Sequence, residues 1–344
     1  MKIVFGISHP KHVFIFKNVI EYLIKRGHNI KVIAVDKEIS KYLLTKFNIN
    51  YSLIGKNQHS MVSKLLVLPH WEYLTYKLLK NFKPDLFVGR AIPHMAHISA
   101  IMRKPYIVFE DTEIATTVHK ITLPFASAVV TPLSYKRNHG KKHHRFDGFF
   151  EHGYLAKEYF TPDSSVLDDL NVNIGEKIIL VRFVAWKASH DIGDYGFQDR
   201  IEAINDLVKY GKVFISSEET LPTELKKYEL LIPYEKIHHL MYFSDLFIGE
   251  SATMATECAI LGTPSIYIST SRRGYTDELE KVYNMLYTFS DKSKSQNYAL
   301  QMAIELLSNP DSKKLWKEKS KILEKEKIDV TKYMCDFIED YNPV

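Results

Sequence analysis

The sequence has very little cysteine and no long apolar run. Cys258 and Cys335 are the only cysteines among 344 residues, so no disulfide framework supports the fold. Both lie in apolar helical patterns, where we expect them to fill a core in a reducing compartment. No run approaches the roughly eighteen apolar residues of a membrane-spanning helix, and residues 1–5 begin a strand rather than a signal peptide. We therefore expect a cytoplasmic protein, at most peripheral to the inner face of the membrane.

Several common functional signatures are absent as well. The chain contains no G-x-S-x-G, G-x-x-x-x-G-K-[ST], C-x-x-C or G-x-G-x-x-G, which argues against a hydrolase elbow, a P-loop, a thioredoxin-like motif and a dinucleotide fingerprint. The histidine pairs His94/His97 and His143/His144 lack further ligands at metal-binding spacing, so we expect no metal and no other cofactor. The formal charge of +5 is mild for the length and does not indicate nucleic acid as a partner.

What the first half does contain is a regular alternation of strand and helix patterns. An apolar run at 2–8 is followed by a helical pattern at 13–26, which ends at Gly27, and by a strand at 29–35. The same alternation continues as far as a strand at 128–131. Strands that alternate with helices predict a parallel sheet with helices on both faces.

A second alternation begins after Thr161-Pro162-Asp163. It starts with a strand at 177–184 and includes a short strand at 230–232. We therefore predict an α/β protein of two Rossmann-like, doubly wound parallel-sheet domains, residues 1–160 and 161–344, with the last helix able to pack back on the first domain. The cleft between two such domains is the expected binding site.

The stretch from Ser244 to Thr270 is the most informative part of the chain. It predicts a buried strand, a tight turn of small residues, a helix that Gly262 and Pro264 terminate, and a second strand. The first turn of such a helix presents unpaired N–H groups and the positive end of its dipole, and both attract anions.

The side chains in this turn suit a nucleotide. Ser251, Ala252 and Thr253 are small enough for a phosphate to approach the backbone closely. Glu257 lies further along the same helix, and a carboxylate suits the two hydroxyls of a ribose. The alternative is an ordinary βαβ unit in which Thr253 caps the helix and Glu257 is solvated.

A second candidate loop runs from Arg182 to Asp191, after the first strand of the second half. A loop in this position lies at the ligand crevice of an open α/β sheet. Arg182, Lys187 and Ser189 can all bind phosphate, and Trp186 lies among them. The alternative is that Trp186 is a hydrophobic plug and that the charges around it are solvated.

Candidates for acid–base chemistry follow two strands of the first half. His12 comes after the first strand, at the start of a helix, and Asp111 and Glu113 belong to the E-D-T-E that ends a later strand. One of these groups is a candidate general base. The alternatives are a hydrogen bond at the helix start for His12 and a capping role for at least one carboxylate.

Residues 136–145 contain five basic residues, three histidines and no acid. Two interpretations stay open: a solvated basic loop, or an anion site for the phosphates of an acceptor or for membrane head groups. The basic residues are Lys136, Arg137, Lys141, Lys142 and Arg145.

Several of these motifs resemble those of known families. The stretch S-D-L-F-I-G-E-S-A-T-M-A-T-E-C-A-I-L-G-T-P-S-I at 244–266 is similar to the nucleotide-sugar signature of GT-B glycosyltransferases. H-V-F at 12–14, with R-G-H-N-I-K-V at 26–32, resembles the opening of the transferase that adds N-acetylglucosamine to the lipid-linked cell-wall precursor. Nearly the whole chain, including D-T-E-I-A and V-R-F-V-A-W-K-A-S-H-D, resembles a GT-B-like family of archaea and bacteria known mainly as a domain of unknown function.

The resemblance implies a GT-B fold and a metal-independent glycosyltransferase. Such an enzyme would move a sugar from a nucleotide-diphosphate sugar, with UDP as the nucleotide, to a glycan or lipid-linked acceptor in surface polysaccharide or glycolipid synthesis. Peripheral membrane contact would accompany a lipid-linked acceptor. His12 or Glu113 would take the proton of the acceptor hydroxyl.

The same resemblance assigns the donor site. Glu257 would bind the ribose hydroxyls, backbone near Leu231 and Ile232 would read the base, and the diphosphate would be held by Ser251 to Thr253 with Arg182 and the loop to Ser189. One departure is Glu250-Ser251-Ala252, where Gly-Gly is usual. Glu250 must point away from a diphosphate bound here, because the two charges repel.

Two other interpretations stay open. The non-hydrolysing UDP-N-acetylglucosamine 2-epimerases share this fold, although only Glu257 represents their paired acidic motif here. The second is a nucleotide-sugar-binding or assembly subunit without turnover. An epimerase needs no acceptor, and a binding protein forms neither product.

Overall fold

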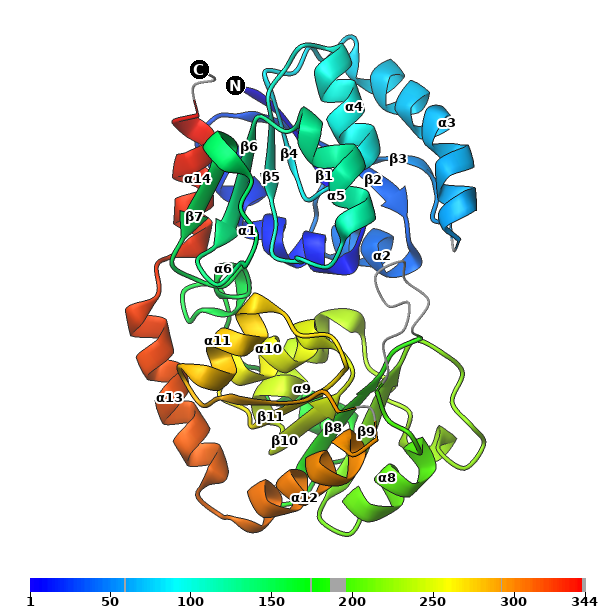
Figure 1. The fold of residues 1–344 in the computed structure, drawn as a ribbon, viewed down its shortest axis with the longest axis vertical. Coiled ribbons are helices and arrows are strands. Elements are labelled where there is room, and N and C mark those ends of the chain that lie inside the picture. Colours follow the sequence, from blue (N-terminus) through cyan, green and yellow to red (C-terminus); the bar gives the residue numbers. More distant parts are fainter. Residues whose placement is uncertain (59, 174, 186–195, 292, 342–344) are drawn as a thin grey trace. The chain divides into compact units, whose positions relative to one another are not determined.

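The computed structural model describes residues 1–58, 60–173, 175–185, 196–291 and 293–341. The chain divides into two compact units (Figure 1). Unit 1 consists of Met1–Tyr154 with Ile328–Val344, and unit 2 consists of Leu155–Lys327. Each unit is built on one parallel sheet covered by helices, as the alternating pattern of the sequence predicts.

Unit 1 contains a seven-stranded sheet in the order β3-β2-β1-β4-β5-β6-β7, in which every pairing is parallel. Its strands are β1 (Lys2–Ile7), β2 (Asn29–Asp36), β3 (Tyr51–Lys56), β4 (Leu86–Gly89), β5 (Tyr106–Phe109), β6 (Ala128–Pro132) and β7 (His143–Phe146). Its helices are α1 (Pro10–Lys25), α2 (Glu38–Lys46), α3 (Met61–Leu79), α4 (Pro93–Ile101), α5 (Thr116–Thr122) and α14 (Val330–Glu339), with short turns η1 (Leu123–Phe125) and η2 (Gly140–Lys142) and α6 (His152–Leu155) at the junction to unit 2.

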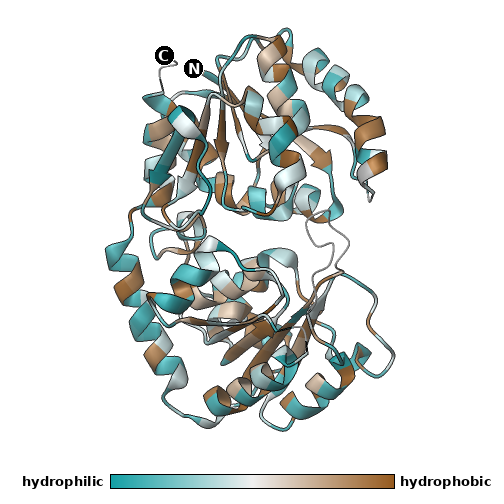
Figure 2. Ribbon diagram, viewed as in Figure 1, coloured by the Kyte–Doolittle hydropathy of each residue, from teal (hydrophilic) through white to brown (hydrophobic). Residues whose placement is uncertain are grey.

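Both faces of this sheet are buried, because its central strands are almost continuously apolar (Figure 2). On one face, the rings of Phe5 in β1 and Phe16 in α1 pack edge to face with centroids 5.5 Å apart. On the other, Val4 shares a core with Met95 of α4. This alternation of consecutive residues is the period of a strand with helices on both sides.

The last helix belongs to unit 1 rather than to the second half of the chain. α14 packs on α1, and Thr331 donates a hydrogen bond to the carbonyl of Gly153 at 2.7 Å. Cys335 lies buried on the apolar face of α14, as we expected of both cysteines. The division at Tyr154 and Leu155 lies a few residues before the boundary placed at 160 and 161 from the sequence.

Unit 2 contains a five-stranded parallel sheet in the order β12-β11-β10-β8-β9. Its strands are β8 (Ile178–Phe183), β9 (Lys212–Ser217), β10 (Leu246–Gly249), β11 (Ser265–Ile268) and β12 (Leu286–Phe289). Its helices are α7 (Ser165–Asp169), α8 (Arg200–Leu207), α9 (Ile237–Phe243), α10 (Ala252–Ile260), α11 (Gly274–Lys281), α12 (Ser295–Ser308) and α13 (Ser312–Glu326), with short turns η3 (Lys226–Tyr228) and η4 (Tyr234–Lys236).

Two local expectations differ from the structure. The short strand predicted at 230–232 is wrong, because Leu231 is 80% exposed and the segment is a loop with one isolated bridge just before it, between Ile215 and Glu229. Conversely, the basic segment 136–145 contains η2 and most of β7, which no apolar pattern announces. β7 pairs with β6 at the edge of the sheet, where polar side chains are tolerated.

Candidate functional site

In both sheets the strand order reverses beside the first strand of the unit. β1 lies between β2 and β4, and β8 lies between β9 and β10. Connections that leave to opposite sides of one strand open a crevice at the carboxyl ends, where open α/β sheets bind their ligands. The predicted candidate bases follow β1 and β5 in unit 1, and the residues predicted to bind phosphate or ribose follow β8 and β10 in unit 2. The predicted base-reading residues follow β9, and the basic segment follows β6.

The turn after β10 ends in a capped helix start. Ser251 is the N-cap of α10, and its Oγ accepts a hydrogen bond from the N–H of Met254 at 3.3 Å. The cap is therefore Ser251 and not Thr253. Helix geometry leaves the N–H groups of Ala252 and Thr253 without an acceptor inside the helix, so they are available to a ligand.

Glu250 is directed to the loop after β8. Its carboxylate accepts hydrogen bonds from the N–H groups of Val184 and Phe197, each at 2.8 Å, and pairs with Arg200 at 3.0 Å. Burial raises the pKa of Glu250, and these three donors oppose that rise. The carboxylate thus links Val184, before residues 186–195, to Phe197, after them. Glu250, which stands where Gly-Gly is usual, therefore has a structural role.

Arg182 is already engaged at the carboxyl end of β8. It donates to Ser216 Oγ at 2.8 Å and pairs with Glu218 at 2.5 Å. The other predicted members of this loop, Trp186, Lys187 and Ser189, lie outside the described residues.

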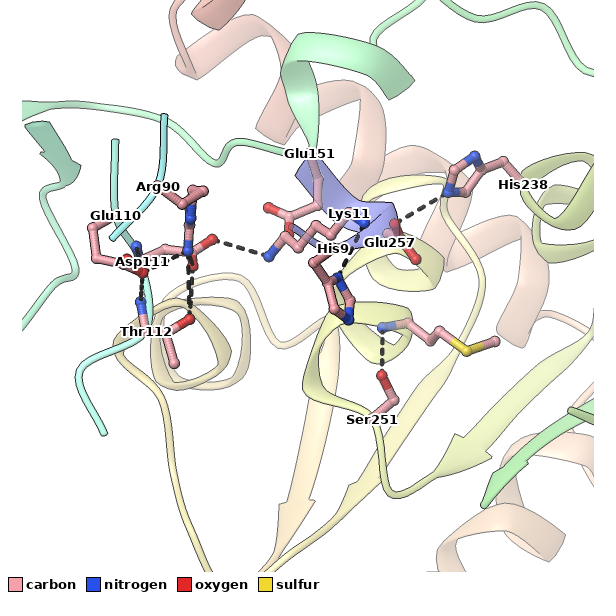
Figure 3. A network of polar contacts seen from close by, with 11 residues as sticks. His9, Lys11, Arg90, Glu110, Asp111, Thr112, Glu151, His238, Ser251 and Glu257 are labelled. Atoms are coloured by element: carbon pink, nitrogen blue, oxygen red, sulfur yellow. Dashed lines mark hydrogen bonds and ion pairs between the residues drawn. The ribbon is translucent and has the colours of Figure 1, made fainter. Parts of the chain in front are cut away.

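Glu257 is buried one turn further along α10. Its Oε1 lies 3.1 Å from Nε2 of His238 in α9 (Figure 3), and its exposed fraction is 5%, so it is not a solvated residue. No motif marks His238 in the sequence. Its only signal is the helical spacing to Met241, which places both side chains on the buried face of α9.

The two residues predicted to read the base lie in the loop before η4, where Leu231 is exposed and Ile232 is half-buried.

The edge of the sheet in unit 1 carries a buried cluster of charges. Arg90, which follows β4, pairs with both Glu110 and Asp111, which follow β5. Lys11 of α1 lies 3.0 Å from Asp111 Oδ2 and 2.8 Å from Glu151 Oε1 (Figure 3). Sequence reasoning missed Arg90, Lys11 and Glu151, because each stands alone in its own segment and only the sheet brings them together.

The cluster separates the acidities of its carboxyl groups. Burial alone would raise the pKa of Asp111, but Arg90 and Lys11 outweigh it and hold that pKa well below the ordinary range. Arg90 and His119 likewise overcome burial to lower the pKa of Glu110 to about 2. Burial and the charge of Asp111 raise the pKa of Glu151 despite its ion pair with Lys11. Carboxyl groups with separated pKa values are suited to proton transfer.

His12 and Glu113 have more local partners. His12 is half-buried in the first turn of α1, and its Nδ1 accepts the N–H of Ser8 at 3.3 Å. In this tautomer the ring proton is on Nε2, and burial together with nearby cations lowers the pKa of His12, which keeps the ring neutral. Glu113 is buried, and its Oε1 accepts the N–H of Lys136 at 3.3 Å, which fastens the start of the basic segment.

Two cations of the basic segment anchor it to backbone carbonyls, most of which lie outside the segment. Arg145 donates to the carbonyls of Leu133, Tyr135 and Arg137 at 3.0, 2.6 and 2.7 Å. Lys142 donates to the carbonyls of Leu123 and Ala126. The other three predicted residues of the anion patch are exposed: Lys136, Arg137 and Lys141.

Within the described ranges, no three His, Cys, Asp or Glu side chains are grouped to hold a metal ion. In the same ranges, no helix combines the length and the apolar character that a membrane span requires.

The chain belongs to the family described as a protein of unknown function, DUF354, whose model matches residues 1–335. An uncharacterized protein of Methanocaldococcus jannaschii is 24% identical over 271 residues, which cover 76% of this chain and 79% of that protein. The family is the one that the sequence motifs resemble.

Solved structures share the fold at low sequence identity. The UDP-GlcNAc 2-epimerase from Neisseria meningitidis bound to UDP-GlcNAc superposes with a TM-score of 0.68 at 13% identity, covering 99% of this chain and 100% of that one. The spinosyn forosaminyltransferase gives 0.65 at 11% identity, covering 99% and 100%. These likenesses confirm the predicted two-domain, Rossmann-like GT-B fold.

The charge cluster predicts a specific pH dependence of stability. The folded pKa of Glu110 is about 2, below its ordinary value of 4.5, so the stabilisation is complete above pH 4.5 and is lost as the pH falls toward 2. Glu110→Gln removes this titration. In urea unfolding at a series of pH values, the free energy of unfolding of Glu110→Gln should fall less steeply over this window than that of the wild type. The reason is that the variant takes up as much as one proton fewer on unfolding.

Glu305→Gln, which removes an exposed carboxylate on α12, is the matched control and should keep the wild-type slope. Equal slopes for Glu110→Gln and the wild type would contradict the assignment.

Proposed function

We propose that this member of the DUF354 family is a glycosyltransferase that binds a nucleotide-diphosphate sugar, with UDP as the nucleotide, at the carboxyl ends of β8 and β10. The observation that carries the proposal is the combination at the start of α10. There a serine-capped helix start lies beside Glu257, which is buried and oriented by His238. The switch point of the sheet is the expected place for such a ligand.

Each part of the donor has a partner in this arrangement. The N–H groups of Ala252 and Thr253 and the positive end of α10 suit the diphosphate. Glu257 suits the ribose hydroxyls, because an ionised carboxylate only accepts hydrogen bonds. Because Arg200 and two backbone N–H groups already hold Glu250, its charge is compensated within unit 2.

The remaining donor residues keep the roles that the sequence suggests. Arg182, beside its ion pair with Glu218, would contact the diphosphate from the end of β8, and the backbone near Leu231 and Ile232 would read the base. The phosphate-binding roles of Trp186, Lys187 and Ser189 stay predictions, because these residues lie outside the described ranges.

The reaction transfers the sugar without a metal. The oxygen of an acceptor hydroxyl, on a glycan or a lipid-linked glycan, bonds to the anomeric carbon while the bond from that carbon to the diphosphate oxygen breaks. The bonding electrons leave with UDP, whose charge the start of α10 stabilises. The acceptor proton passes to a base on unit 1.

His12 is the proposed base. Its ring is neutral at neutral pH, as a base requires, because burial and nearby cations lower its pKa. Nε2 becomes the accepting atom when the ring proton moves to Nδ1, at the cost of the long 3.3 Å hydrogen bond from Ser8. Asp111 is a weak base because its ion pairs hold its pKa low, and Glu113 is fastened to Lys136.

Donor binding is tested by titrating UDP into the protein with EDTA present. A ligand that binds only the folded state raises its melting temperature, and saturation at about 100 times Kd corresponds to about 2.7 kcal/mol. We expect Glu257→Gln and Glu257→Ala to weaken UDP about 10- to 100-fold, because hydrogen bonds to a charged group are lost. Glu305→Ala should bind UDP as the wild type does. Unchanged affinity in both Glu257 variants would contradict the site.

The base is tested by substitution of His12. We expect His12→Ala to keep the Kd for UDP and to lower kcat for sugar transfer by about 10²- to 10⁴-fold, the usual contribution of general base catalysis. His12→Gln keeps a hydrogen-bonding side chain without a titratable base and should be equally slow. Full transfer activity in either variant would exclude His12 as the base.

A second candidate function, epimerisation at C2 of a UDP-N-acetyl sugar, is favoured by one observation. Glu151, which Lys11 links to Asp111, is a buried carboxyl group whose pKa is raised by burial, and epimerisation needs a group that removes a proton from C2 and returns one. Incubation with UDP-GlcNAc in deuterated water, without acceptor, distinguishes the two. An epimer that carries deuterium at C2 would replace the transferase proposal. UDP binding without either product would leave a non-catalytic nucleotide-sugar-binding protein.

A further inference from the structure

An open hollow of about 670 Å³ lies on unit 1 beside the basic segment. α5 and η1 form one side of it, and residues of segment 136–145 form the other. Its polar lining consists of Thr116, His119, Lys120, Arg137, His139 and Lys142. All of these belong to unit 1, and none has a place in the donor site.

The lining carries positive charge. Lys120, Arg137 and Lys142 each contribute a cation, and among the described residues no aspartate or glutamate lines the hollow. Lys120 and Arg137 are exposed and have no acidic partner among the residues that the structure describes. Lys142 is fixed by the carbonyls of Leu123 and Ala126, so its charge stays at the wall. Uncompensated charge in a concave surface concentrates the field on an anion.

A buried histidine in the wall has, among the described residues, only a distant carboxylate as its partner. The exposed fraction of His119 is 5%, and neither ring nitrogen makes a hydrogen bond to any part of the chain that the structure describes. Nε2 lies 3.6 Å from Glu110 Oε2, which is too long for a good hydrogen bond. Buried polar groups are normally satisfied, so the ring nitrogens of His119 are available to a ligand atom in the hollow.

His139 lies beside His119 and close to the same cations. His139 packs edge to face on His119 with ring centroids 6.3 Å apart. Burial lowers the pKa of His139, and the nearby His119, Lys142 and Arg137 lower it further. An anion in the hollow would oppose these cations, so the imidazole of His139 can report its arrival.

We propose that this hollow binds a phosphoryl group at the end of a larger molecule, a phosphate or diphosphate monoester. Arg137 offers two parallel N–H donors that match two phosphate oxygens, Lys120 offers a mobile ammonium, and the ring of His119 offers a buried partner. A single phosphate is far smaller than the hollow, whose volume is that of sites for whole small molecules. Only the further step, that this molecule is the sugar acceptor, rests on the proposed function.

The test is a calorimetric titration of the full-length protein with phenyl phosphate and with pyrophosphate at low salt. We expect Arg137→Gln and Lys120→Gln to weaken phenyl phosphate about tenfold each, because each removes a charge-assisted hydrogen bond. Lys141→Gln removes one charge from an exposed position of the same segment outside the lining, and should change the affinity less than about twofold.

Either of two results would overturn the site. One is no binding of phenyl phosphate to the wild type. The other is equal weakening by Lys141→Gln and Arg137→Gln, which would indicate diffuse attraction to the segment. Ring resonances of the histidines give an independent readout, in which phenyl phosphate should shift those of His119 and His139. Saturation without either shift would place the anion elsewhere.

Two crossed controls separate this site from the donor site. Arg137→Gln should keep the affinity for UDP, and Glu257→Ala should keep the affinity for phenyl phosphate. If the protein binds phenyl phosphate but not UDP, the proposed function is rejected and the proposed phosphoryl site in the hollow is retained. Co-sedimentation of the wild type, but not of Arg137→Gln, with phosphatidic acid vesicles would identify the source of the phosphate as a lipid.

Discussion

The structure depends on one constraint, the reversal of strand order beside β1 and β8 in two fully parallel sheets. Because all strands of a parallel sheet end at the same edge, residues far apart in the sequence meet there. In unit 1 this gathers Lys11, Arg90 and Asp111 into one cluster. In unit 2 it places the capped start of α10 beside the end of β8.

At the carboxyl ends of the strands, charged groups with partners in the chain have structural roles, and those without such partners are candidates for ligand binding. Arg90 and Glu250 are buried, and partners in the same unit compensate the charge of each, so they brace loops. The start of α10 and the hollow beside α5 instead present donors or cations, and no carboxylate of the described residues is paired with them there. Both places suit phosphate. The two proposals, a site for a nucleotide-diphosphate sugar and a site for a phosphorylated molecule, require two such places.

Sequence reasoning predicted the α/β fold and the strand, turn and helix around Ser251, because these depend on local periodicity and capping. It failed for β7, whose polar residues pair only at an edge, and for 230–232, where three apolar residues before a proline do not form a strand. It also missed His238 and Glu151, because their partners lie 19 and 140 residues away in the chain. The structural role of Glu250 could not be predicted from the sequence, because its three donors, on Val184, Phe197 and Arg200, are far from it in the chain.

The most direct test of the central claim is hydrogen exchange of the intact protein with and without UDP. The account predicts slower exchange of the amides of Ala252 and Thr253, because their N–H groups would donate to the diphosphate. Protection should extend to Glu257 and its neighbours on α10, and Glu257→Ala should diminish it. UDP binding that leaves the start of α10 unprotected, or that protects only unit 1, would contradict the assignment of the donor site.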